Sequence, residues 1–397
     1  MLRYWTAGES HGKTLLALVD GFPAGLAIDE EFINRELKLR QGGYGRGGRQ
    51  KLEQDTVDFL SGVWQGTTLG SPIALQIVNN DYKLERLKEL ERPRPGHADL
   101  TGAIKYLGSI RGVLERSSAR ETAARVAAGA LARLLLREFG IESVGYVVEL
   151  GEMKFGEMKL GELKQSSPQG SESKPASATI AELRARRDQS SIYSIHPESD
   201  RGAEAYIDRM ADEGDTLGGV IEVRVDGLPF GLGTHAQWDR KLDGRLAQAV
   251  MAVQAIKGVE IGLGFEAARR RGSQVHDPIH HDPALAHLPH LGYVRPTNNA
   301  GGLEGGMTNG QSLILRAAKK PISTLRKPLD SIRMEDKQPH RANYERSDVC
   351  AISAAAIIIE SVVAFEIACA FVDKFGGDSL IEMKARYELF LKMARER

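Results

Sequence analysis

The chain has 397 residues, and its 53 lysines and arginines balance its 53 aspartates and glutamates, so the formal net charge is zero. A nucleic-acid-binding protein normally carries a basic excess, and this balance argues against one. Hydrophobic residues make up 42% of the chain and charged residues 27%, a mixture that excludes a disordered or fibrous protein and is typical of a globular one.

Two elements are predicted in the first part of the chain. Residues 14–19, TLLALV, form an apolar run typical of a buried strand. The clearest helix runs from Ala119 to Phe139. Ser118 and Glu121 have the spacing of a capping box at its start, and Gly140 supplies a stop at its end.

Three features follow later in the chain. Residues 151–178 contain a five-residue repeat and then a polar stretch, which predicts a flexible, exposed insertion. Residues 220–225, VIEVRV, alternate as a half-buried strand does. Residues 349–371 are apolar and long enough to span a bilayer. Because Glu360 and Glu366 lie inside this run and would be costly at mid-membrane depth, we expect a buried core helix and no membrane contact.

One segment occurs twice. VDGFPAGL at 19–26 and VDGLPFGL at 225–232 match at six of eight positions, and each copy follows an apolar strand. A helix-like segment follows each copy, over 29–40 and 238–256. The repetition predicts two related halves and not a solenoid, whose period would be far shorter.

We therefore expect one domain over residues 1–397, with pseudo-symmetric halves at about 1–200 and 201–397. Strands and helices are interspersed without the regular alternation of a doubly wound sheet, so the predicted fold class is α+β. Two cysteines, Cys350 and Cys369, are too few for a disulfide framework and indicate a reducing, cytoplasmic location.

The N-terminal motif GESHGKT satisfies a phosphate-binding P-loop pattern between Ala7 and Thr14. However, only six residues precede it, and the sequence after it is strand-like where a P-loop requires a helix. We favour a tight turn that presents His11 as an acid or base near neutral pH, with a purely structural histidine as the alternative.

A glycine-rich segment, RQGGYGRGGRQ at 40–50, holds Arg40, Arg46 and Arg49 among five glycines. Arginine binds phosphate and carboxylate in a bidentate manner, and glycine lets the backbone approach an anion. The segment predicts a pocket for a small anionic molecule; a solvated loop or an RNA-binding RGG segment is the alternative.

Two further motifs carry polar side chains. In ERPRPGHADLTG, His97 follows two prolines that stiffen its approach, although a histidine in a loop is often structural. In ERSSARET, Arg116, Ser117 and Ser118 are placed at a predicted helix start, where free N–H groups and the helix dipole favour phosphate. Simple N-capping by Ser118 is the alternative.

The last third of the chain contains a second glycine-dense loop at 297–310 and the segment KKPIST at 319–324. Lys320, Ser323 and Thr324 could hold a phosphate or ring heteroatoms. In ERSDVC, Asp348 precedes the apolar helix and is either its cap or a base.

The stretch HDPIHHD at 276–282, with His287 and His290 nearby, raises the question of a metal. Its prolines make it a loop, without the helical spacing that catalytic zinc sites usually use, so no metal site is predicted.

Taken together, the motifs GESHG, RQGGYGRGGRQ, RPGHAD, RSSARETAARVAAGA, QAIKGVEIG, NNAGGLEGGMTNG, KPIST and RSDVCA resemble the chorismate synthase family. They occur in the family's order and cover the chain from about residue 6 to 370. Two departures, the longer 151–178 insertion and an embellished HHDPALAHLPH stretch, touch none of them. The resemblance implies a helical layer between two antiparallel sheets and a homotetramer.

The resemblance also implies an activity: the 1,4-anti elimination of phosphate from 5-enolpyruvylshikimate 3-phosphate, giving chorismate with reduced FMN as cofactor and no net redox change. Arg40, Arg46 and Arg49 would bind the substrate's anionic groups, and the first two are also associated with NADP in the family. The residues implied to contact FMN are Arg116, Ser117, Ser118, Gln254, Ala255, Gly305, Lys320, Pro321, Ile322, Ser323, Thr324 and Arg346.

By the same resemblance, His11 would be the general acid toward the departing phosphate and His97 would stabilise the charge of the reduced flavin. Asp348 would tune or relay a proton at flavin N5. Some family members reduce their own flavin with NADPH and others need FMN reduced for them, and the motifs leave both open. A P-loop nucleotide hydrolase and an RNA-binding protein remain as alternatives from other classes.

Overall fold

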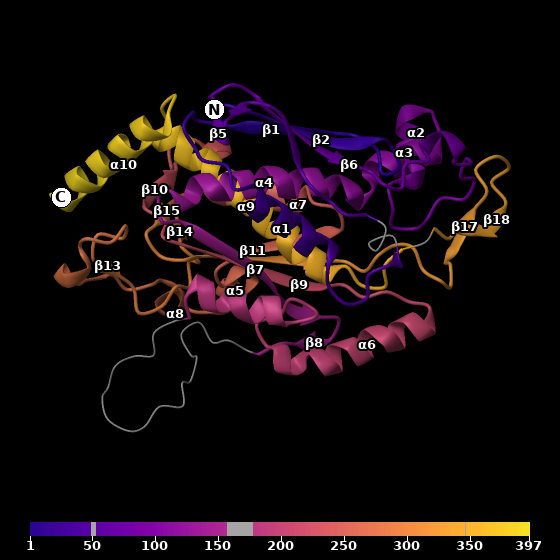
Figure 1. The fold of residues 1–397 in the computed structure, drawn as a ribbon. Coiled ribbons are helices and arrows are strands. Elements are labelled where there is room, and N and C mark those ends of the chain that lie inside the picture. Colours follow the sequence, from indigo (N-terminus) through magenta and orange to yellow (C-terminus); the bar gives the residue numbers. More distant parts are fainter. Residues whose placement is uncertain (49–52, 157–177, 346) are drawn as a thin grey trace.

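The computed structural model describes residues 1–48, 53–156, 178–345 and 347–397. Two antiparallel sheets enclose a layer of helices (Figure 1). The first sheet has the order β1-β2-β6-β3, formed by Arg3–Ala7, Thr14–Asp20, Ile73–Val78 and Asp58–Ser61. The second has the order β11-β16-β9-β7-β8, formed by Ile256–Ile261, Leu313–Lys319, Gly219–Asp226, Glu142–Leu150 and Met153–Lys154.

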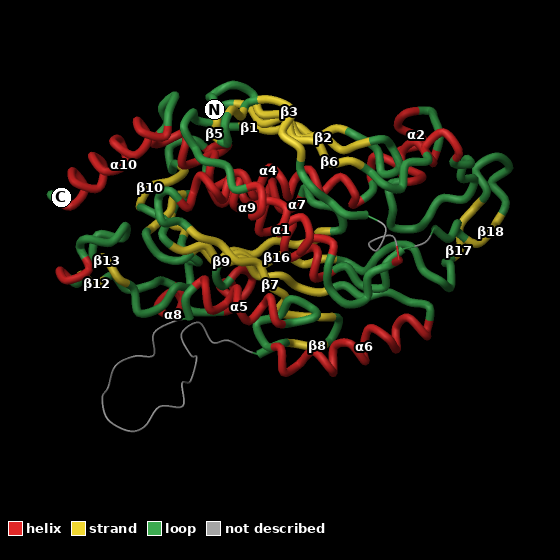
Figure 2. The backbone as a smooth tube through the Cα atoms, viewed as in Figure 1, coloured by secondary structure: helices red, strands yellow, loops and turns green. Residues whose placement is uncertain are grey.

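Four helices form the layer between the sheets: α1 (Glu30–Gln41), α4 (Thr122–Arg137), α7 (Leu242–Met251) and α9 (Ile352–Phe375). Figure 2 shows these helices between the strands of the two sheets. α4 contacts β2 and β6 of the first sheet, whereas α9 contacts β7 and β9 of the second and also packs against α1, α4 and α7. The predicted α+β class and the helical layer between two antiparallel sheets are confirmed.

The remaining elements lie around this sandwich. α5 covers the outer face of the second sheet, α2 and α3 lie at one end of the molecule, and α10 lies at the other (Figure 1). The helices are α2 (Asp99–Tyr106), α3 (Ile110–Ser117), α5 (Ile180–Gln189), α6 (Asp200–Glu213), α8 (Gly272–Val275) and α10 (Leu380–Arg395). Short strands are β4 (Val63–Trp64), β5 (Thr67–Thr68), β10 (Phe230–Gly233), β12 (His280–His281), β13 (Tyr293–Val294), β14 (Leu303–Glu304), β15 (Met307–Asn309), β17 (Asp330–Ile332) and β18 (Pro339–Arg341). Single 3₁₀ segments are Leu84–Arg86, Ala119–Glu121, Pro197–Ser199, Trp238–Arg240, Gly264–Arg269 and Pro283–Leu285.

The apolar helix α9 is buried in the core, as predicted. By length and composition it could cross a membrane, but 89% of its most apolar stretch is buried inside the structure. Its Glu360 carboxylate forms an ion pair with Arg133 at 2.9 Å and accepts a hydrogen bond from Arg187 at 3.0 Å. The helix begins three residues later than the apolar run does, because the backbone of Cys350 pairs with Leu217 in a β-bridge. Ion pairing by two arginines is what lets a carboxylate lie inside this helical layer.

The start of α4 differs from the prediction. Residues 119–121 form a 3₁₀ turn, and the Ser118 hydroxyl accepts from the backbone N–H of Arg120. The Glu121 side chain does not return to Ser118 but accepts from Thr6 at 2.6 Å and from Arg125 at 3.0 Å. The predicted capping box is therefore wrong, because Glu121 is used for contacts with other elements.

Strand β2, which was predicted to be a buried strand, is buried on one face only. Leu15, Ala17 and Val19 point into the core and are at most 1% exposed, whereas Leu18 is 42% exposed. No other described element covers the outer face of this sheet, so successive side chains face opposite environments. The alternation predicted for residues 220–225 is confirmed in β9, where Ile221, Val223 and Val225 are the buried residues.

The first copy of the repeated segment, 19–26, runs from the end of β2 into a buried loop. The Thr68 hydroxyl on β5 donates to the carbonyl of Pro23 at 2.7 Å and accepts from the N–H of Leu26 at 2.9 Å. β4 and β5 pair with Val63 opposite Thr68, and the turn between them contains Gly66.

The second copy, 225–232, has the same arrangement at the end of β9. The Thr308 hydroxyl on β15 donates to the carbonyl of Pro229 at 2.5 Å and accepts from the N–H of Leu232 at 2.9 Å. β14 and β15 pair with Leu303 opposite Thr308, in the register of the first hairpin.

Each copy is followed by a helix, α1 after the first and the shorter α7 after the second. Within the described residues, the same local motif, a VDGxPxGL loop bridged by a threonine of a hairpin, therefore occurs in two copies. The assignment of two whole halves remains a prediction. Of the predicted insertion, residues 157–177 lie outside the described residues.

Candidate active site

Four segments meet at the end of the helical layer that carries α2 and α3 (Figure 1, right). They are the turn 8–13 between β1 and β2, the loop 94–99 before α2, the segment 320–324 after β16, and Glu345, Ser347 and Asp348 before α9. All four segments carry candidate residues predicted from the sequence.

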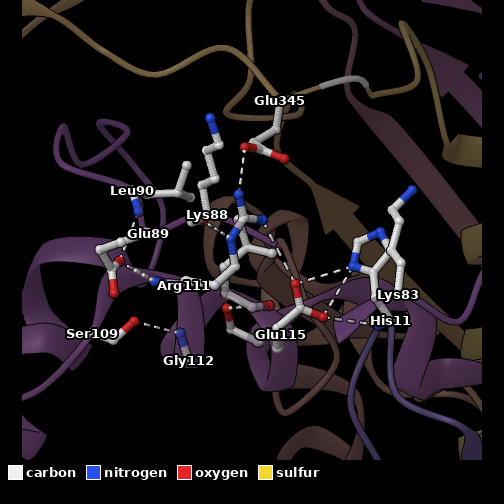
Figure 3. A network of polar contacts seen from close by, with 12 residues as sticks. His11, Lys83, Lys88, Glu89, Leu90, Ser109, Arg111, Gly112, Glu115 and Glu345 are labelled. Atoms are coloured by element: carbon white, nitrogen blue, oxygen red, sulfur yellow. Dashed lines mark hydrogen bonds and ion pairs between the residues drawn. The ribbon is translucent and has the colours of Figure 1, made fainter. Parts of the chain in front are cut away.

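His11 lies in the 8–13 turn, and its imidazole faces the buried carboxylate of Glu115 on α3 (Figure 3). Nδ1 lies 3.0 Å from each carboxylate oxygen, and the backbone N–H of His11 donates to Oε2 at 2.8 Å. On the other side of the ring, Nε2 is 3.8 Å from Asp81 Oδ2. Burial alone raises the pKa of Glu115, but hydrogen bonds from His11 outweigh it, so this pKa lies below its usual value. His11 is therefore held between two carboxylates.

Asn79, the residue after β6, shapes the turn that carries His11. Its buried Nδ2 donates to the carbonyl of Gly12 at 2.8 Å and to that of Glu9 at 3.2 Å. Its Oδ1 accepts from Arg120 at 2.9 Å. The turn leads directly into β2 and not into a helix, so the P-loop alternative lacks the helix N-terminus that would bind a phosphate.

His97 is also paired with a buried carboxylate. Its Nδ1 lies 2.5 Å from Asp99 Oδ1, and Arg94 binds Asp99 Oδ2 at 2.8 Å. Burial of Asp99 raises its pKa, but hydrogen bonds from His97 and Arg94 lower it well below the usual range. Both candidate histidines therefore contact a carboxylate through Nδ1.

The His97 loop is joined to the KPIST segment. The carbonyl of Gly96 accepts from the Lys320 ammonium and, at 3.2 Å, from the Ser323 hydroxyl. Arg94 donates to the Thr324 hydroxyl at 2.9 Å. The backbone N–H of Lys320 in turn donates to the carbonyl of Ala255 at 2.9 Å. The structure thus brings together His97, the 320–324 segment and Ala255.

Asp348 closes the site from the side of α9. Its Oδ2 lies 2.8 Å from Arg46, and its Oδ1 accepts from the N–H of Gly47 at 2.6 Å. Ser347 beside it donates to the carbonyl of Thr324 at 3.3 Å. Because the N-terminal cap of α9 is Ala351, the alternative role of Asp348 as a helix cap is wrong.

Arg40 does not lie in an open anion pocket. It is buried on α1, and its Nη2 donates to Asp55 at 2.7 Å, while Arg120 also binds Asp55 at 2.7 Å. Burial lowers the pKa of Arg40 to about 10, although Asp55 acts in the opposite direction. Arg49 and Arg346 lie outside the described residues.

The structure corrects the predicted location of Arg116 and Ser117. They end the separate helix α3 and do not begin α4, so the helix end near them carries the negative pole of the dipole. Arg116 donates to the carbonyls of Thr6 and Gly8 at 2.9 and 3.1 Å. Ser118 follows them as the cap of the 3₁₀ turn. The phosphate site predicted from a helix N-terminus is therefore not present at Arg116 and Ser117.

Gln254 is linked to Arg116 through the side chains of Thr6 and Glu121. Arg116 donates to the Thr6 hydroxyl at 2.9 Å, and Thr6 donates to Glu121 at 2.6 Å. Gln254 Nε2 donates to the same carboxylate at 3.2 Å, and Gln254 Oε1 is buried without a hydrogen-bond partner among the described residues.

Within one chain, Gly305 lies far from the end of α9 at which Asp348 lies. It is exposed in the turn between β14 and β15, and β15 pairs with β10. β10 lies beside Lys374 near the C-terminal end of α9, whereas Asp348 precedes the N-terminal end. A helix of 24 residues is about 36 Å long, so the two positions are far apart.

The histidine-rich loop shows no metal centre. Among the described residues, no group of three or more histidine, cysteine, aspartate or glutamate side chains could hold a metal ion. Asp277 is used locally, where it accepts from Thr297 at 2.5 Å and from the N–H of Asn299 at 2.8 Å.

Comparison with known proteins agrees with this geometry. The sequence profile of one family, described as chorismate synthase, matches residues 2–372. The chorismate synthase of Geobacter metallireducens is 54% identical over 409 aligned positions that cover 100% of both chains. The chain belongs to the chorismate synthase family. The chorismate synthase of Desulforamulus reducens is 51% identical to this chain, and the alignment covers 100% of both chains. A crystal structure of a chorismate synthase has a TM-score of 0.79 and 41% identity, and the match covers 100% of this chain and 99% of that one.

The geometry fits the flavin that the chorismate synthase family implies. The residues that would contact it supply an ammonium from Lys320 and hydroxyls from Ser323 and Thr324. Gln254 Oε1 and Arg46 Nε are buried without hydrogen-bond partners among the described residues. Unsatisfied buried polar atoms of this kind are expected where a polar ligand completes a site.

Sequence reasoning missed Lys319, the last residue of β16. It lies on the core-facing side of the strand, where Leu315 and Ala317 are fully buried. Its ammonium has no hydrogen bond or ion pair within the described residues, and Arg46 and Asp348 are among its charged neighbours. Burial lowers the pKa of Lys319, and Arg46 adds to this effect. A lysine on the core-facing side of a strand, next to the motif KPIST, was the available signal.

Glu115, Asp99 and Asn79 were also missed. Glu115 and Asp99 lie in the motifs ERSSARET and ERPRPGHADLTG, which were noted for other residues, whereas Asn79 lies in none of the noted motifs. Glu115 and Asn79 both bind the 8–13 turn, which is distant from them in sequence. The pairing of Glu115 with His11 joins residues that are 104 positions apart, which no local pattern reveals.

Proposed function

We propose that the chain is a carbon–oxygen lyase that converts 5-enolpyruvylshikimate 3-phosphate to chorismate by 1,4-anti elimination of phosphate, a step of aromatic amino-acid biosynthesis. The observation that carries the proposal is the meeting of two histidine–carboxylate pairs with unneutralised lysines and Arg46 at one end of the helical layer. Membership of the chorismate synthase family supports the same reaction.

The cations of the site suit a substrate with one phosphate and two carboxylates, which carries roughly four negative charges at neutral pH. Arg46 is neutralised only by Asp348, and Lys319 and Lys320 have no carboxylate partner among the described residues. The Lys320 ammonium binds a neutral carbonyl of Gly96. The local charge is therefore positive, and an anionic ligand would offset it. Arg40 would contribute positive charge from the buried cluster that it forms with Asp55.

Reduced FMN would be held by Ser118, Gln254, Ala255 and the segment Lys320–Thr324, with Arg116 and Ser117 beside them and Arg346 from the segment before α9. When bound, the reduced flavin supplies electron density to the substrate and recovers it, so the reaction has no net redox change. NADPH is a candidate reductant, and an external reductant is the alternative.

The histidines and Asp348 would handle protons. The doubly protonated imidazole of His11 would donate its Nε2 proton to the departing phosphate and keep the Nδ1 proton, which faces the Glu115 carboxylate. His97, oriented by Asp99, would stabilise negative charge on the flavin. Asp348 would hold a proton near the flavin, at the carboxylate that Arg46 and Gly47 position.

A homotetramer is proposed on two observations. Trp5, Leu18 and Val78 are 49%, 42% and 50% exposed on the outer face of the first sheet, which is apolar enough to pack against a second copy. Gly305 lies far from the other flavin residues of its own chain, so it could contact a flavin only in a neighbouring copy. Sedimentation analysis tests the assembly, and a monomer at micromolar concentration would contradict it. A cytoplasmic location is proposed from the two free, buried cysteines.

The activity test is anaerobic chorismate formation from 5-enolpyruvylshikimate 3-phosphate with chemically reduced FMN, followed by absorbance and by phosphate release. We expect turnover only when reduced FMN is present. His11→Ala should lower kcat by about 10²- to 10⁴-fold while FMN binding persists. Asp348→Asn should also slow turnover, whereas Asp277→Asn in the histidine-rich loop is the control and should not.

Folded, FMN-binding protein that forms no product would refute the proposed reaction. Near-normal turnover of His11→Ala would remove the leaving-group role alone, and an unchanged rate for Asp348→Asn would remove its proton-holding role.

A further inference from the structure

We infer that Glu115 is the positioning residue of His11: it fixes the proton of the imidazole on Nδ1 and thereby makes Nε2 the atom that exchanges protons with a ligand. The inference rests on the proposed function for the meaning of that proton exchange. The geometry itself is independent of the reaction.

The first observation is the number of contacts between the two residues (Figure 3). Both Glu115 oxygens lie 3.0 Å from His11 Nδ1, and Oε2 also accepts the backbone N–H of His11 at 2.8 Å. One carboxylate therefore holds the ring and the backbone of the same residue. An ionised carboxylate can only accept, so Nδ1 must be the donor and must carry the proton.

The second observation is that Glu115 is ionised and immobile. Its side chain is 1% exposed, and Oε1 lies 3.7 Å from Arg111 Nη1 on the next turn of α3. Arg111 is itself fixed, because it donates to the carbonyl of Lys88 at 3.0 Å and to Glu345 at 3.1 Å. The lowered pKa of Glu115, which hydrogen bonds from His11 produce against the effect of burial, agrees with the ionised form.

The third observation concerns the segment on which His11 lies. The backbone carbonyl of Glu115 accepts from the N–H of Ser10 at 2.8 Å, so α3 binds two successive residues of the turn. The turn and the ring are thus set by one residue of α3. A residue that only stabilised the turn would need the backbone contacts but not the two oxygens facing Nδ1.

The fourth observation is the environment of the other ring nitrogen. Nε2 is 3.8 Å from Asp81 Oδ2, which is too long for a hydrogen bond. Asp81 is in turn bound by the Lys83 ammonium at 2.8 Å. With Nδ1 bound to Glu115, Nε2 is the ring nitrogen that faces away from α3, toward a carboxylate that Lys83 already neutralises.

The test is Glu115→Gln, which keeps the size of the side chain and one acceptor oxygen but removes the charge and the symmetric pair of acceptors. Glu89→Gln is the matched control, because Glu89 binds the backbone of Arg111 in the same network without contacting His11. The tautomer of His11 is measured by magic-angle-spinning NMR of protein labelled with ¹⁵N-histidine, with the His11 signals assigned by their loss in His11→Gln.

We expect neutral His11 to carry its proton on Nδ1 in the unmodified protein and in Glu89→Gln, and to become a mixture of tautomers in Glu115→Gln. The signals of His97 should not change. Turnover should fall about 10- to 100-fold in kcat, as is usual when the partner that orients a functional histidine is replaced, with KM and FMN affinity retained.

A proton on Nε2 of neutral His11 in the unmodified protein would overturn the inference without any variant. It would also be overturned if folded Glu115→Gln kept both the tautomer and kcat. If Glu115→Gln fails to fold, Glu115→Asp replaces it: this variant keeps the charge but withdraws the oxygens, and the same two measurements decide. The tautomer can be measured even if no chorismate forms, so failure of the proposed reaction and failure of this inference are distinguishable.

Discussion

The two buried threonines of the repeated motif give a stability prediction that can be worked out from the structure. Thr68 and Thr308 are each 2% exposed, and each hydroxyl bridges a carbonyl and an N–H of its own copy of the VDGxPxGL loop. Valine has almost the same shape as threonine, so Thr68→Val removes the two hydrogen bonds and leaves the packing nearly intact.

Each substitution leaves two buried backbone groups without partners. One unpaired buried group costs about 1–3 kcal/mol, and the apolar methyl group recovers a part of that, so we expect about 2–4 kcal/mol per site. Because Thr68 and Thr308 share no partner, the double variant should show the sum of the two losses to within about 0.5 kcal/mol. The control is Thr67→Val, which lies next to Thr68 but is half-buried and has no side-chain hydrogen bond among the described contacts; it should change stability by less than about 0.5 kcal/mol.

The assay is urea denaturation at one fixed protein concentration, with the loss of stability taken from the midpoint at constant slope. Hydrogen exchange of the Leu26 and Leu232 amides provides a local measurement, because each amide loses its acceptor in only one of the variants. The reasoning is refuted if Thr68→Val or Thr308→Val costs no more than Thr67→Val, or if the exchange of the two amides does not follow the site that was changed.

Burial raises the pKa of Asp55, but the two arginines beside it lower it by more, so the folded pKa lies below the unfolded value of about 3.9. The stabilisation by Asp55 is full above the unfolded pKa and is lost as the pH falls through the folded value. Asp55→Asn should therefore flatten the loss of stability in acid, and urea midpoints measured from about pH 5 downward, to well below the unfolded pKa, would show it. Lys319→Met should weaken the binding of inorganic phosphate, measured calorimetrically. The control is Lys392→Met on α10, at the other end of the molecule, and equal affinities of the two variants would contradict the assigned anion contact. Burial raises the pKa of both Cys350 and Cys369, so neither thiol should react with a disulfide reagent at pH 8 until urea unfolds the protein, and fast labelling of the native chain would count against this burial.

Much of the fold could be predicted from the sequence where a pattern is local. The burial of α9 followed from two glutamates within an apolar run, and β9 followed from simple alternation. The partners of Glu360 could not be predicted, because Arg133 and Arg187 come from α4 and α5, and only the folded chain brings them within 3.0 Å. The exposure of Leu18 was missed for a related reason: an apolar run does not reveal which face of a sheet remains uncovered.

In the site, too, residues within local motifs could be predicted, whereas contacts between distant segments could not. The motifs identified His11, His97 and Asp348, and Thr324 of the 320–324 segment contacts both Arg94 in the His97 loop and Ser347 beside Asp348. Arg116 was misplaced because α3 was not predicted. Its start had a local signal, since the Ser109 side chain accepts from the N–H of Gly112 as an N-cap does, and the buried Ile110 and Leu114 have helical spacing. The helix is only eight residues long, and the prediction overlooked it. Glu115 could not be found at all, because its role depends on a contact between distant segments.

The central location of α9 has a consequence for synthesis of the chain. The helices α1 and α4 and the strands β7 and β9 all pack against it, and Ala24 near the N-terminus exchanges backbone hydrogen bonds with residues 378 and 380. Roughly 240 residues separate the end of α4 from the end of α9, which is roughly 10–50 s of translation at about 5–20 residues per second. During that time the apolar inner faces of the N-terminal half have no partner. A ribosome that stops before residue 352 would release a chain without a closable core, so we expect such fragments to depend on chaperones or to aggregate.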